Sequence, residues 1–274
     1  MTQPFSVCMS VYKNDKPADF LVAVRSIIKQ TVKPSEIIMV VDGPIPNELE
    51  EAISTIKVEC NGLKLVRFEK NQGHAAARQA GVDNATCDLV AVMDSDDIAR
   101  ADRFEKQLTF LQHNPDIDIV GGQIEEFIGE VNNVVGKRVV PGTDEEIKKY
   151  LKSRCPMNLM TILTRKSSIQ KVGGYIDWFC EEDYYLWIRM ALAGCKFANL
   201  PDTLVDVRVG KEMYQRRGGW KYFKSEASLQ HYMWKHGLIG FGRYLYNVAI
   251  RFAVQVAMPN SVRGWVFRTF ARQA

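Results

Sequence analysis

Three carboxylates follow one strongly apolar run of the chain. Asp94, Asp96 and Asp97 come directly after residues 89–93, with Ser95 between the first two acids. Carboxylates this close repel one another unless a positive charge neutralises them. A divalent cation such as Mn²⁺ or Mg²⁺ prefers oxygen ligands, and a diphosphate would supply those that the protein lacks. The pattern predicts a metal and diphosphate site; the alternative is a solvated turn in which one aspartate caps the next helix.

A second acidic group opens a helix-like stretch over residues 181–193. It consists of Glu181, Glu182 and Asp183. Acids at the start of a helix interact favourably with its dipole, which alone would explain them. The chemical alternative is a general base, because transfer of a group to a hydroxyl requires a carboxylate that takes the proton while a metal stabilises the departing diphosphate.

A polar turn and a stretch of small residues lie between these two groups, over residues 71–78. Arg78 falls about one turn into the predicted helix, within reach of a carboxylate or a phosphate. The alternative is a surface arginine.

The elements that position these side chains alternate regularly through the first half of the chain. β-rich runs at 5–12, 37–41, 63–68 and 89–93 are separated by amphipathic stretches at 17–30, 47–58 and 73–84, and a further one follows at 102–113. This order predicts an α/β fold with a mostly parallel central sheet flanked by helices. Ligands bind at the carboxyl ends of such strands, so we expect residues 13–15, Asp42, Asn71 and Asp94 to meet at one edge of the sheet.

The pattern changes after about residue 115. Strands are predicted at 117–128, 131–140 and 159–164, and helices at 181–193 and 212–236.

Composition narrows the class of protein. The 274 residues are 46% hydrophobic and 25% charged, which is ordinary for a well-cored soluble protein, and the net charge of +4 is too small to indicate nucleic-acid binding. The six cysteines include no CxxC pair, so we expect reduced thiols in a cytoplasmic protein rather than a disulfide framework or a zinc site. No export signal and no apolar run of the ~20 residues that a membrane span needs is visible.

The C-terminal stretch is basic and aromatic. Residues 241–270 contain seven aromatic side chains, and five arginines with no acid fall within residues 243–272. Such a segment suits an anionic membrane surface. The alternative is a terminal helix packed on the rest of the protein.

Six short stretches, taken in order, resemble the inverting glycosyltransferases of family 2, which have the GT-A fold. The stretches are residues 6–12, 26–31, 36–43, 71–73 with Arg78, 93–97 and 182–189, and the resemblance covers about residues 4–210. It implies a nucleotide-sugar-binding half over residues 1–115, an acceptor-binding half over 116–210, and a helical C-terminal extension over 211–274.

The resemblance also implies roles for individual residues. A UDP-sugar donor would be held by side chains and backbone at Val11, Tyr12, Asp15, Asp42, Arg78, Asp94 and Ser95. Asp96 would be the first metal ligand and Asp94 the second. Asp183 would be the general base, with Glu182 beside it. Attack from the side opposite the leaving UDP would invert the anomeric centre.

The chain departs from the family pattern at three places. Val41 replaces one nucleotide-contacting acid, Val209 stands near the position where many relatives carry a histidine after an arginine, and the QxxRW pattern of processive synthases is missing. Because the QxxRW pattern is missing and no membrane span is visible either, we expect an enzyme that adds a single sugar.

The variant stretches at 41–44 and 213–219 are similar to enzymes of bacterial O-antigen and exopolysaccharide assembly. These enzymes add galactose or glucose to an N-acetylhexosamine linked to undecaprenyl diphosphate. The similarity implies a cytoplasmic protein that lies peripherally on the inner face of the bacterial inner membrane. Arg216 and Arg217 would meet the acceptor diphosphate, whose geometry guanidinium groups match, and Trp178 would face the acceptor. Solvated arginines are the alternative.

Two other functions remain open at this point. A nucleotidyltransferase also pairs acids with a metal, but it needs a glycine-rich loop after the first strand, and residues 13–17 are not one. A non-catalytic sugar-nucleotide-binding protein would be expected to lose Asp183.

Overall fold

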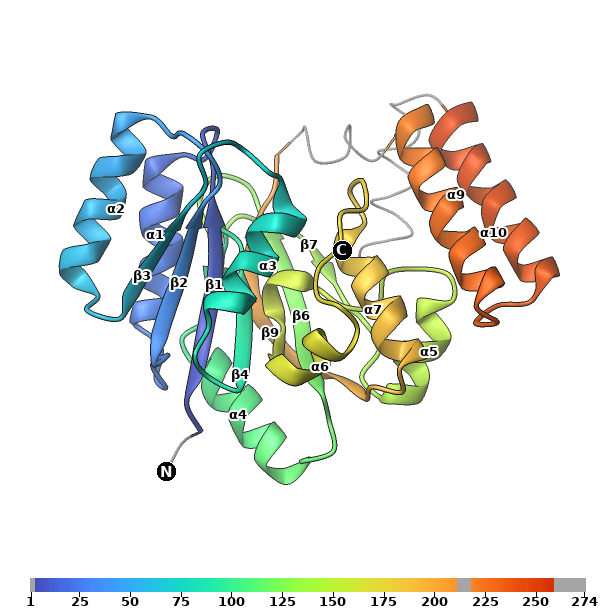
Figure 1. Cartoon of the computed structure of the whole chain (residues 1–274), viewed down its shortest axis with the longest axis horizontal. Coiled ribbons are helices and arrows are strands. Elements are labelled where there is room, and N and C mark those ends of the chain that lie inside the picture. The colour runs from blue at the N-terminus through green and yellow to red at the C-terminus, as the bar shows by residue number, and fades with distance from the viewer. Residues whose placement is uncertain (1–2, 211–217, 259–274) are drawn as a thin grey trace.

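The computed structural model describes residues 3–210 and 218–258 (Figure 1). Within them, nine strands form one sheet: β1 (Phe5–Val11), β2 (Glu36–Val41), β3 (Leu63–Arg67), β4 (Leu89–Met93), β5 (Ile98–Ala99), β6 (Ile119–Phe127), β7 (Val134–Arg138), β8 (Leu163–Arg165) and β9 (Phe197–Arg208). The helices are α1 (Pro17–Ile28), α2 (Asn47–Glu59), α3 (His74–Asn84), α4 (Arg103–His113), α5 (Asp144–Leu151), α6 (Lys166–Lys171), α7 (Glu182–Leu192), α9 (Trp220–Lys235) and α10 (Phe241–Phe252).

The first half of the chain forms the expected parallel sheet. The strand order is β3-β2-β1-β4, and all three pairings are parallel. Every residue of β2 and β4 is buried, as both faces of a helix-covered parallel sheet require. The carboxyl ends of these strands therefore reach the same edge of the sheet.

The second half makes the whole sheet mixed. The order continues β8-β6-β9-β5, and β8 runs antiparallel to both β4 and β6 while β9 is parallel to β6. The sheet is thus less uniformly parallel than the regular alternation of the first half suggests, although helices flank it as predicted.

Two hydrophobic cores lie on opposite faces of the sheet. In one core, α1, α2 and α4 pack against strand side chains on one face of the sheet, such as Val7, Met39 and Ala91. The other joins α3, α5, α6, α7 and α9 to alternate positions such as Cys8 and Val92. This alternation follows from the two-residue period of a strand.

Several predicted elements differ in detail. The strand expected over 159–164 is a 3₁₀ turn (Leu159–Thr161) followed by β8. The helix expected over 212–236 is described only from Trp220, since residues 211–217 lie outside the described residues. Among the described strands and α-helices, those not predicted are α5, α6, β5 and β9.

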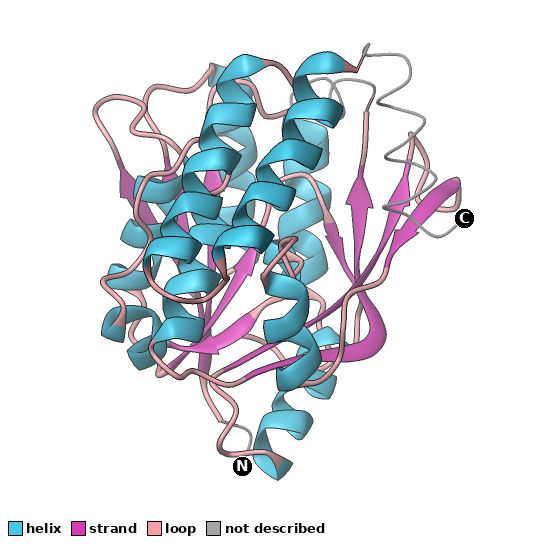
Figure 2. Cartoon of the chain, turned by 90° about the vertical axis from the view of Figure 1, so that its right-hand side faces the viewer, coloured by secondary structure: helices cyan, strands magenta, loops and turns pink. Residues whose placement is uncertain are grey.

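The described part of the C-terminal extension is a helical hairpin. Figure 2 shows α9 and α10 side by side on the outside of the molecule. Asn247 of α10 donates to the carbonyl of Lys152 at 2.8 Å and to Gln230 of α9 at 2.7 Å, which fixes the hairpin to the end of α5.

Candidate active site

The acidic run lies at the end of β4, but its members face different environments. Asp97 is only 2% exposed, and its Oδ1 accepts the backbone N–H of Arg208 at 2.9 Å. Asp96 lies at the accessible rim. Surrounding protein atoms, followed by the charges of Asp94 and Asp15, raise the pKa of Asp96 to about 6. Asp97 thus ties β4 to β9, whereas Asp96 points a carboxylate outward.

The acidic run fits a divalent cation that a diphosphate would also coordinate. Desolvation and the neighbouring negative charges of Asp94 and Asp15 raise the pKa of Asp96, and a cation would offset those charges. Among the described residues no three His, Cys, Asp or Glu side chains are arranged to hold a metal by themselves. Asp94 and Asp96 would therefore provide only part of the coordination shell, with phosphate oxygens completing it.

The loop after β1 is joined to the acidic run through Asp15. Its carboxylate accepts hydrogen bonds from the backbone N–H of Tyr12 at 3.0 Å and from the hydroxyl of Ser95 at 2.9 Å. The carbonyl of Val11 accepts the backbone N–H of Asp42 at 2.8 Å. Val11, Tyr12, Asp15 and Ser95 were all predicted to hold the donor. These contacts place them together with Asp42.

Asp42 is buried and holds the loop before α3. Its two oxygens accept bonds from the side chain of Asn71 at 2.8 Å and from the backbone N–H groups of Gln72 at 2.6 Å and Gly73 at 3.0 Å. The neighbouring Gly43 has φ +87°, and a Cβ there would lie 2.5 Å from the nitrogen of Asn71. Asp42 therefore shapes the loop, while its predicted contact with a nucleotide remains a prediction.

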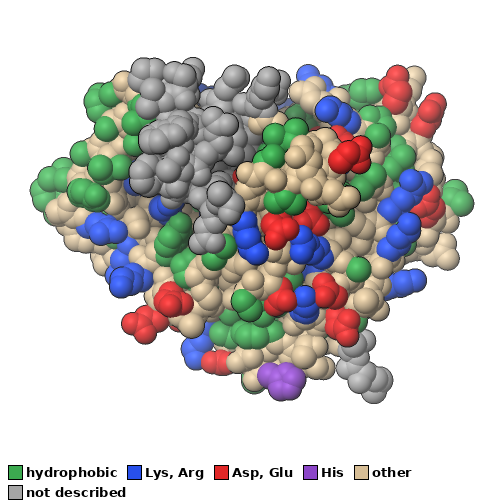
Figure 3. Space-filling model, turned by 180° about the vertical axis from the view of Figure 1, so that it is seen from behind, with side chains coloured by type: hydrophobic (Ala, Val, Ile, Leu, Met, Phe, Trp, Pro, Cys, Tyr) green, Lys and Arg blue, Asp and Glu red, His purple; other side chains and the backbone are tan. Residues whose placement is uncertain are grey.

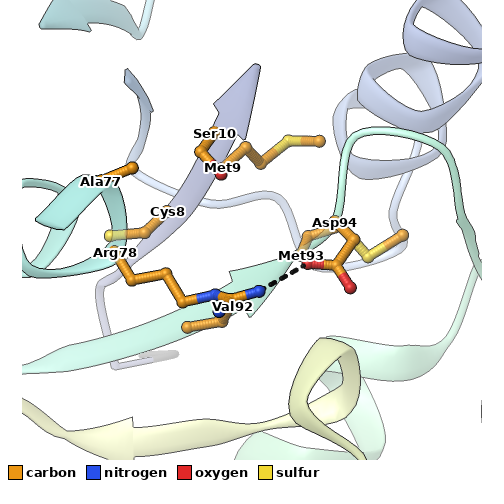
Figure 4. Close-up of a pocket in the computed structure, with 8 residues that line it drawn as sticks. All are labelled: Cys8, Met9, Ser10, Ala77, Arg78, Val92, Met93 and Asp94. Atoms are coloured by element: carbon orange, nitrogen blue, oxygen red, sulfur yellow. Dashed lines mark ion pairs between the residues drawn. The ribbon is translucent and has the colours of Figure 1, made fainter. Parts of the chain in front are cut away.

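Arg78 projects from α3 toward the acidic run (Figure 4). Its guanidinium lies 3.5 Å from Oδ1 of Asp94 and forms a second ion pair with Glu182 of α7. A small pocket beside it is lined by Cys8, Met9, Ser10, Ala77, Arg78, Val92, Met93 and Asp94. Arg78 thus brings the two predicted acidic groups into one site.

Asp183 lies at the start of α7. Burial and, to a smaller extent, the charge of Glu182 raise the pKa of Asp183, whereas the charge of Arg78 lowers it. Its Oδ1 accepts the backbone N–H of Tyr184 at 2.7 Å. The thiol of Cys155 lies 3.9 Å from the other oxygen, Oδ2, and the pKa of that thiol is itself raised by burial and by Asp183. Asp183 is therefore a carboxylate with an increased affinity for a proton.

The family of the chain follows from its sequence. Residues 6–177 match the model of glycosyl transferase family 2, which is more than half of the 274 residues. The chain is a family 2 glycosyltransferase.

Two bacterial relatives match this glycosyltransferase over most of its length. A UDP-Gal:alpha-D-GlcNAc-diphosphoundecaprenol beta-1,3-galactosyltransferase of Escherichia coli is 36% identical, over 99% of this chain and 98% of its own. An amylovoran biosynthesis glycosyltransferase of Erwinia amylovora is 35% identical, over 82% of this chain and 84% of its own.

A solved structure supports the GT-A fold of the family. A mannosyltransferase of Pyrobaculum calidifontis, solved with GDP-Man and Mn²⁺, aligns with a TM-score of 0.63 at 15% identity, over 98% of this chain and 81% of its own. The family 2 glycosyltransferase therefore has the predicted fold with helices at its C-terminus.

The residues expected to bind the acceptor are only partly described. The indole of Trp178 lies 4.4 Å from the ring of Tyr185, between ring centroids, and its N–H donates to the carbonyl of Ser225 at 3.2 Å. The hydroxyl of Tyr222 donates to Glu181 at 2.5 Å, so α9 also contacts the segment that precedes Asp183. Arg216 and Arg217 lie outside the described residues.

Two residues of the site carried no functional prediction. Arg208 holds Asp97 through its backbone and donates from its side chain to the carbonyl of Asp96 at 3.2 Å. Cys155 contacts Asp183 from the loop after α5. The resemblance pointed at residues 208–210 only through a missing histidine, and a lone cysteine gives no signal in a sequence.

Proposed function

We propose that this glycosyltransferase transfers galactose or glucose from a UDP-sugar to an N-acetylhexosamine linked to undecaprenyl diphosphate, with inversion at the anomeric carbon. The arrangement that carries the proposal is the pair of acidic sites, Asp94 with Asp96 and Glu182 with Asp183, joined by Arg78. The full-length similarity to a galactosyltransferase named for this type of acceptor supports the substrate class. Within the proposal, residues 1–115 bind the donor and residues 116–210 bind the acceptor.

The chemistry divides between the two acidic sites. Asp183 accepts the proton of the acceptor hydroxyl as that oxygen attacks the anomeric carbon, and its raised proton affinity suits this task. The bond from the anomeric carbon to the UDP oxygen breaks at the same time, so the diphosphate takes the electron pair. A Mn²⁺ or Mg²⁺ ion, when bound by Asp94 and Asp96, would supply positive charge for that leaving group. The hydrogen bond from Ser95 to Asp15 holds the acidic run against the loop after β1.

Product analysis tests this function. The full chain is incubated with Mn²⁺, a panel of UDP-sugars and a synthetic N-acetylglucosamine diphosphate lipid. We expect acceptor-dependent release of UDP with UDP-galactose or UDP-glucose, and a disaccharide lipid with the inverted anomeric configuration. Release of pyrophosphate instead would indicate a nucleotidyltransferase, and UDP-sugar binding without any transfer would indicate a non-catalytic binding protein.

We also propose that the α9–α10 hairpin rests on an anionic membrane, at the inner face of the bacterial inner membrane. Phe241, Leu245, Tyr246 and Ile250 of α10 are each between 47% and 61% exposed. Figure 3, in which the hairpin lies at the left, shows hydrophobic side chains beside basic ones on that side. Within residues 218–258 the one acid, Glu226, is paired with Arg251, so Lys221, Lys224, Lys235 and Arg243 remain as basic charges. None of the helices described is both long and apolar enough to cross a membrane.

Replacing Phe241, Tyr246 and Ile250 together by serine tests the membrane contact. We expect the affinity for vesicles containing phosphatidylglycerol to fall by more than about tenfold, because each large apolar side chain contributes about 1.5 kcal/mol or more when buried. Co-sedimentation with vesicles measures it. Val58→Ser is a matched control, since Val58 is 85% exposed on α2, far from the hairpin in Figure 1. Equal binding by the triple variant and the wild type would contradict the proposal.

A further inference from the structure

Arg78 lies between the two acidic sites, and its side chain is largely shielded from solvent. Its side chain is 11% exposed, and its ion-pair partners are Asp94, at the end of β4, and Glu182, beside the proposed base. The next residue of α3, Gln79, accepts the backbone N–H of Tyr175 at 2.7 Å. One turn of α3 thus contacts both the acidic run and the segment that leads to Asp183.

The charge balance explains why a guanidinium occupies this position. The largely buried guanidinium of Arg78 lies beside the carboxylates of Asp94 and Glu182, and an arginine side chain keeps its positive charge in proteins. Arg78 therefore stays charged, and each acid keeps a partner. A guanidinium has a planar set of donors that can serve two carboxylates at once, whereas a lysine ammonium is a point charge on a flexible stem.

We infer that Arg78 is a positioning residue that holds the base-bearing helix α7 at a set distance from the donor acids. The inference rests on the proposed function, because it assigns the base to Asp183. In this arrangement Arg78 acts through Asp94 and Glu182, and not by contacting the nucleotide. A change at Arg78 should alter the rate of transfer and the proton affinity of the base more than it alters the affinity for UDP.

The environment of Asp183 makes the inference testable through pH. The titratable groups around Asp183 are Glu182 on its own helix, Arg78 from α3, Arg138 from β7, the hydroxyl of Tyr175 and the thiol of Cys155. Arg78 lowers the pKa of Asp183 and Glu182 raises it. Removing Arg78 should therefore move the acid limb of the pH–rate profile to higher pH, and neutralising Glu182 should move it to lower pH. A purely structural contact predicts no such opposite shifts.

The experiment compares Arg78→Lys, Arg78→Met, Glu182→Gln and the double variant Arg78→Met with Glu182→Gln in the full chain. We expect kcat to fall about 100-fold in Arg78→Met, as a displaced catalytic group can cost that much, and about tenfold in Arg78→Lys, which keeps only the charge. The double variant should lose less than Arg78→Met, since no unpaired Glu182 carboxylate remains. The Kd of UDP, measured by calorimetry with Mn²⁺, should stay near that of the wild type.

Arg67→Met is the matched control, because Arg67 pairs with Glu50 on the exposed side of α2 and should leave every measurement unchanged. A large rise in the Kd of UDP with an unchanged kcat at saturating donor would overturn the inference and make Arg78 a nucleotide ligand. An acid limb that stays in place in Glu182→Gln would overturn it as well, and so would a wild-type kcat in Arg78→Lys, so these two milder variants suffice if Arg78→Met does not fold. Failure of the proposed function would appear differently, as full activity in Asp183→Asn.

Discussion

Asp183→Asn is expected to reduce kcat by about 1,000-fold, within the range by which general bases accelerate reactions. The amide cannot take the proton of the acceptor hydroxyl, yet it can still accept the backbone N–H of Tyr184 that the carboxylate accepts at 2.7 Å. Helix α7 should therefore still begin at the same residue, and the Kd of UDP with Mn²⁺ should be unchanged. Single-turnover assays with UDP-galactose and UDP-glucose measure the loss.

The pH dependence of the wild type provides a second readout of the same base. Burial and Glu182 raise the pKa of Asp183, so its charged form is depleted at a higher pH than for an exposed aspartate. We expect kcat/KM to fall as the pH is lowered through that raised pKa, and Asp183→Asn should lack this limb in its residual activity. Asp116→Asn is the control, because Asp116 pairs with Lys196 at the surface. Retention of wild-type kcat by Asp183→Asn would show that another group accepts the proton.

The meeting of the polar segments at one edge of the sheet could be predicted, because it depends only on the order of strands and helices that hydrophobic periodicity indicates. A continuous apolar run marks a buried parallel strand, and parallel strands separated by helices end on the same side. The bonds from Asp42 to the loop that begins at Asn71 and the bond from Ser95 to Asp15 are consequences of that arrangement. The individual bonds were not foreseen, but the meeting of these segments was.

The missed elements lack such a pattern. β9 is interrupted by Pro201 and Asp202, which are typical of a turn, yet the strand continues because its two ends pair with β6 on either side of a register shift. Helix α5 has only eight residues, and of these only Ile147 and Leu151 are buried, too few to show a periodicity. In both cases contacts made by the folded sheet determine the structure.

The contacts across the site depend on the same long-range packing. Cys155 reaches Asp183 from 28 positions away, and Arg208 reaches Asp97 from 111 positions away. Contacts between residues this far apart leave no local pattern in the sequence. The role of Arg78 changed for this reason: a helix position alone indicated a phosphate or a carboxylate partner, and the fold supplies two carboxylates.

Asp96→Asn is expected to reduce kcat/KM by about 1,000-fold and to weaken the binding of Mn²⁺ in the presence of UDP. A metal that neutralises a leaving diphosphate is worth several kcal/mol, and about 4 kcal/mol corresponds to three factors of ten in rate. Asp96 carries this expectation rather than Asp97, because Asp97 is buried against the backbone of Arg208 while Asp96 lies at the accessible rim. Electron paramagnetic resonance of free Mn²⁺ measures binding independently of catalysis.

The pH dependence of Mn²⁺ binding follows from the groups around Asp96. Desolvation by the surrounding protein atoms, followed by the charges of Asp94 and Asp15, raises the pKa of Asp96 to about 6, so a bound cation must compete with protons for the carboxylate. Mn²⁺ binding should therefore weaken as the pH falls toward 6 in the wild type, and much less so in Asp96→Asn. Asp102→Asn is the matched control, as Asp102 pairs with Lys106 on the surface of α4. Wild-type Mn²⁺ affinity and rate in Asp96→Asn would exclude Asp96 as a ligand, whereas a loss in this variant that Asp102→Asn does not show would assign the cation to the accessible rim of the acidic run.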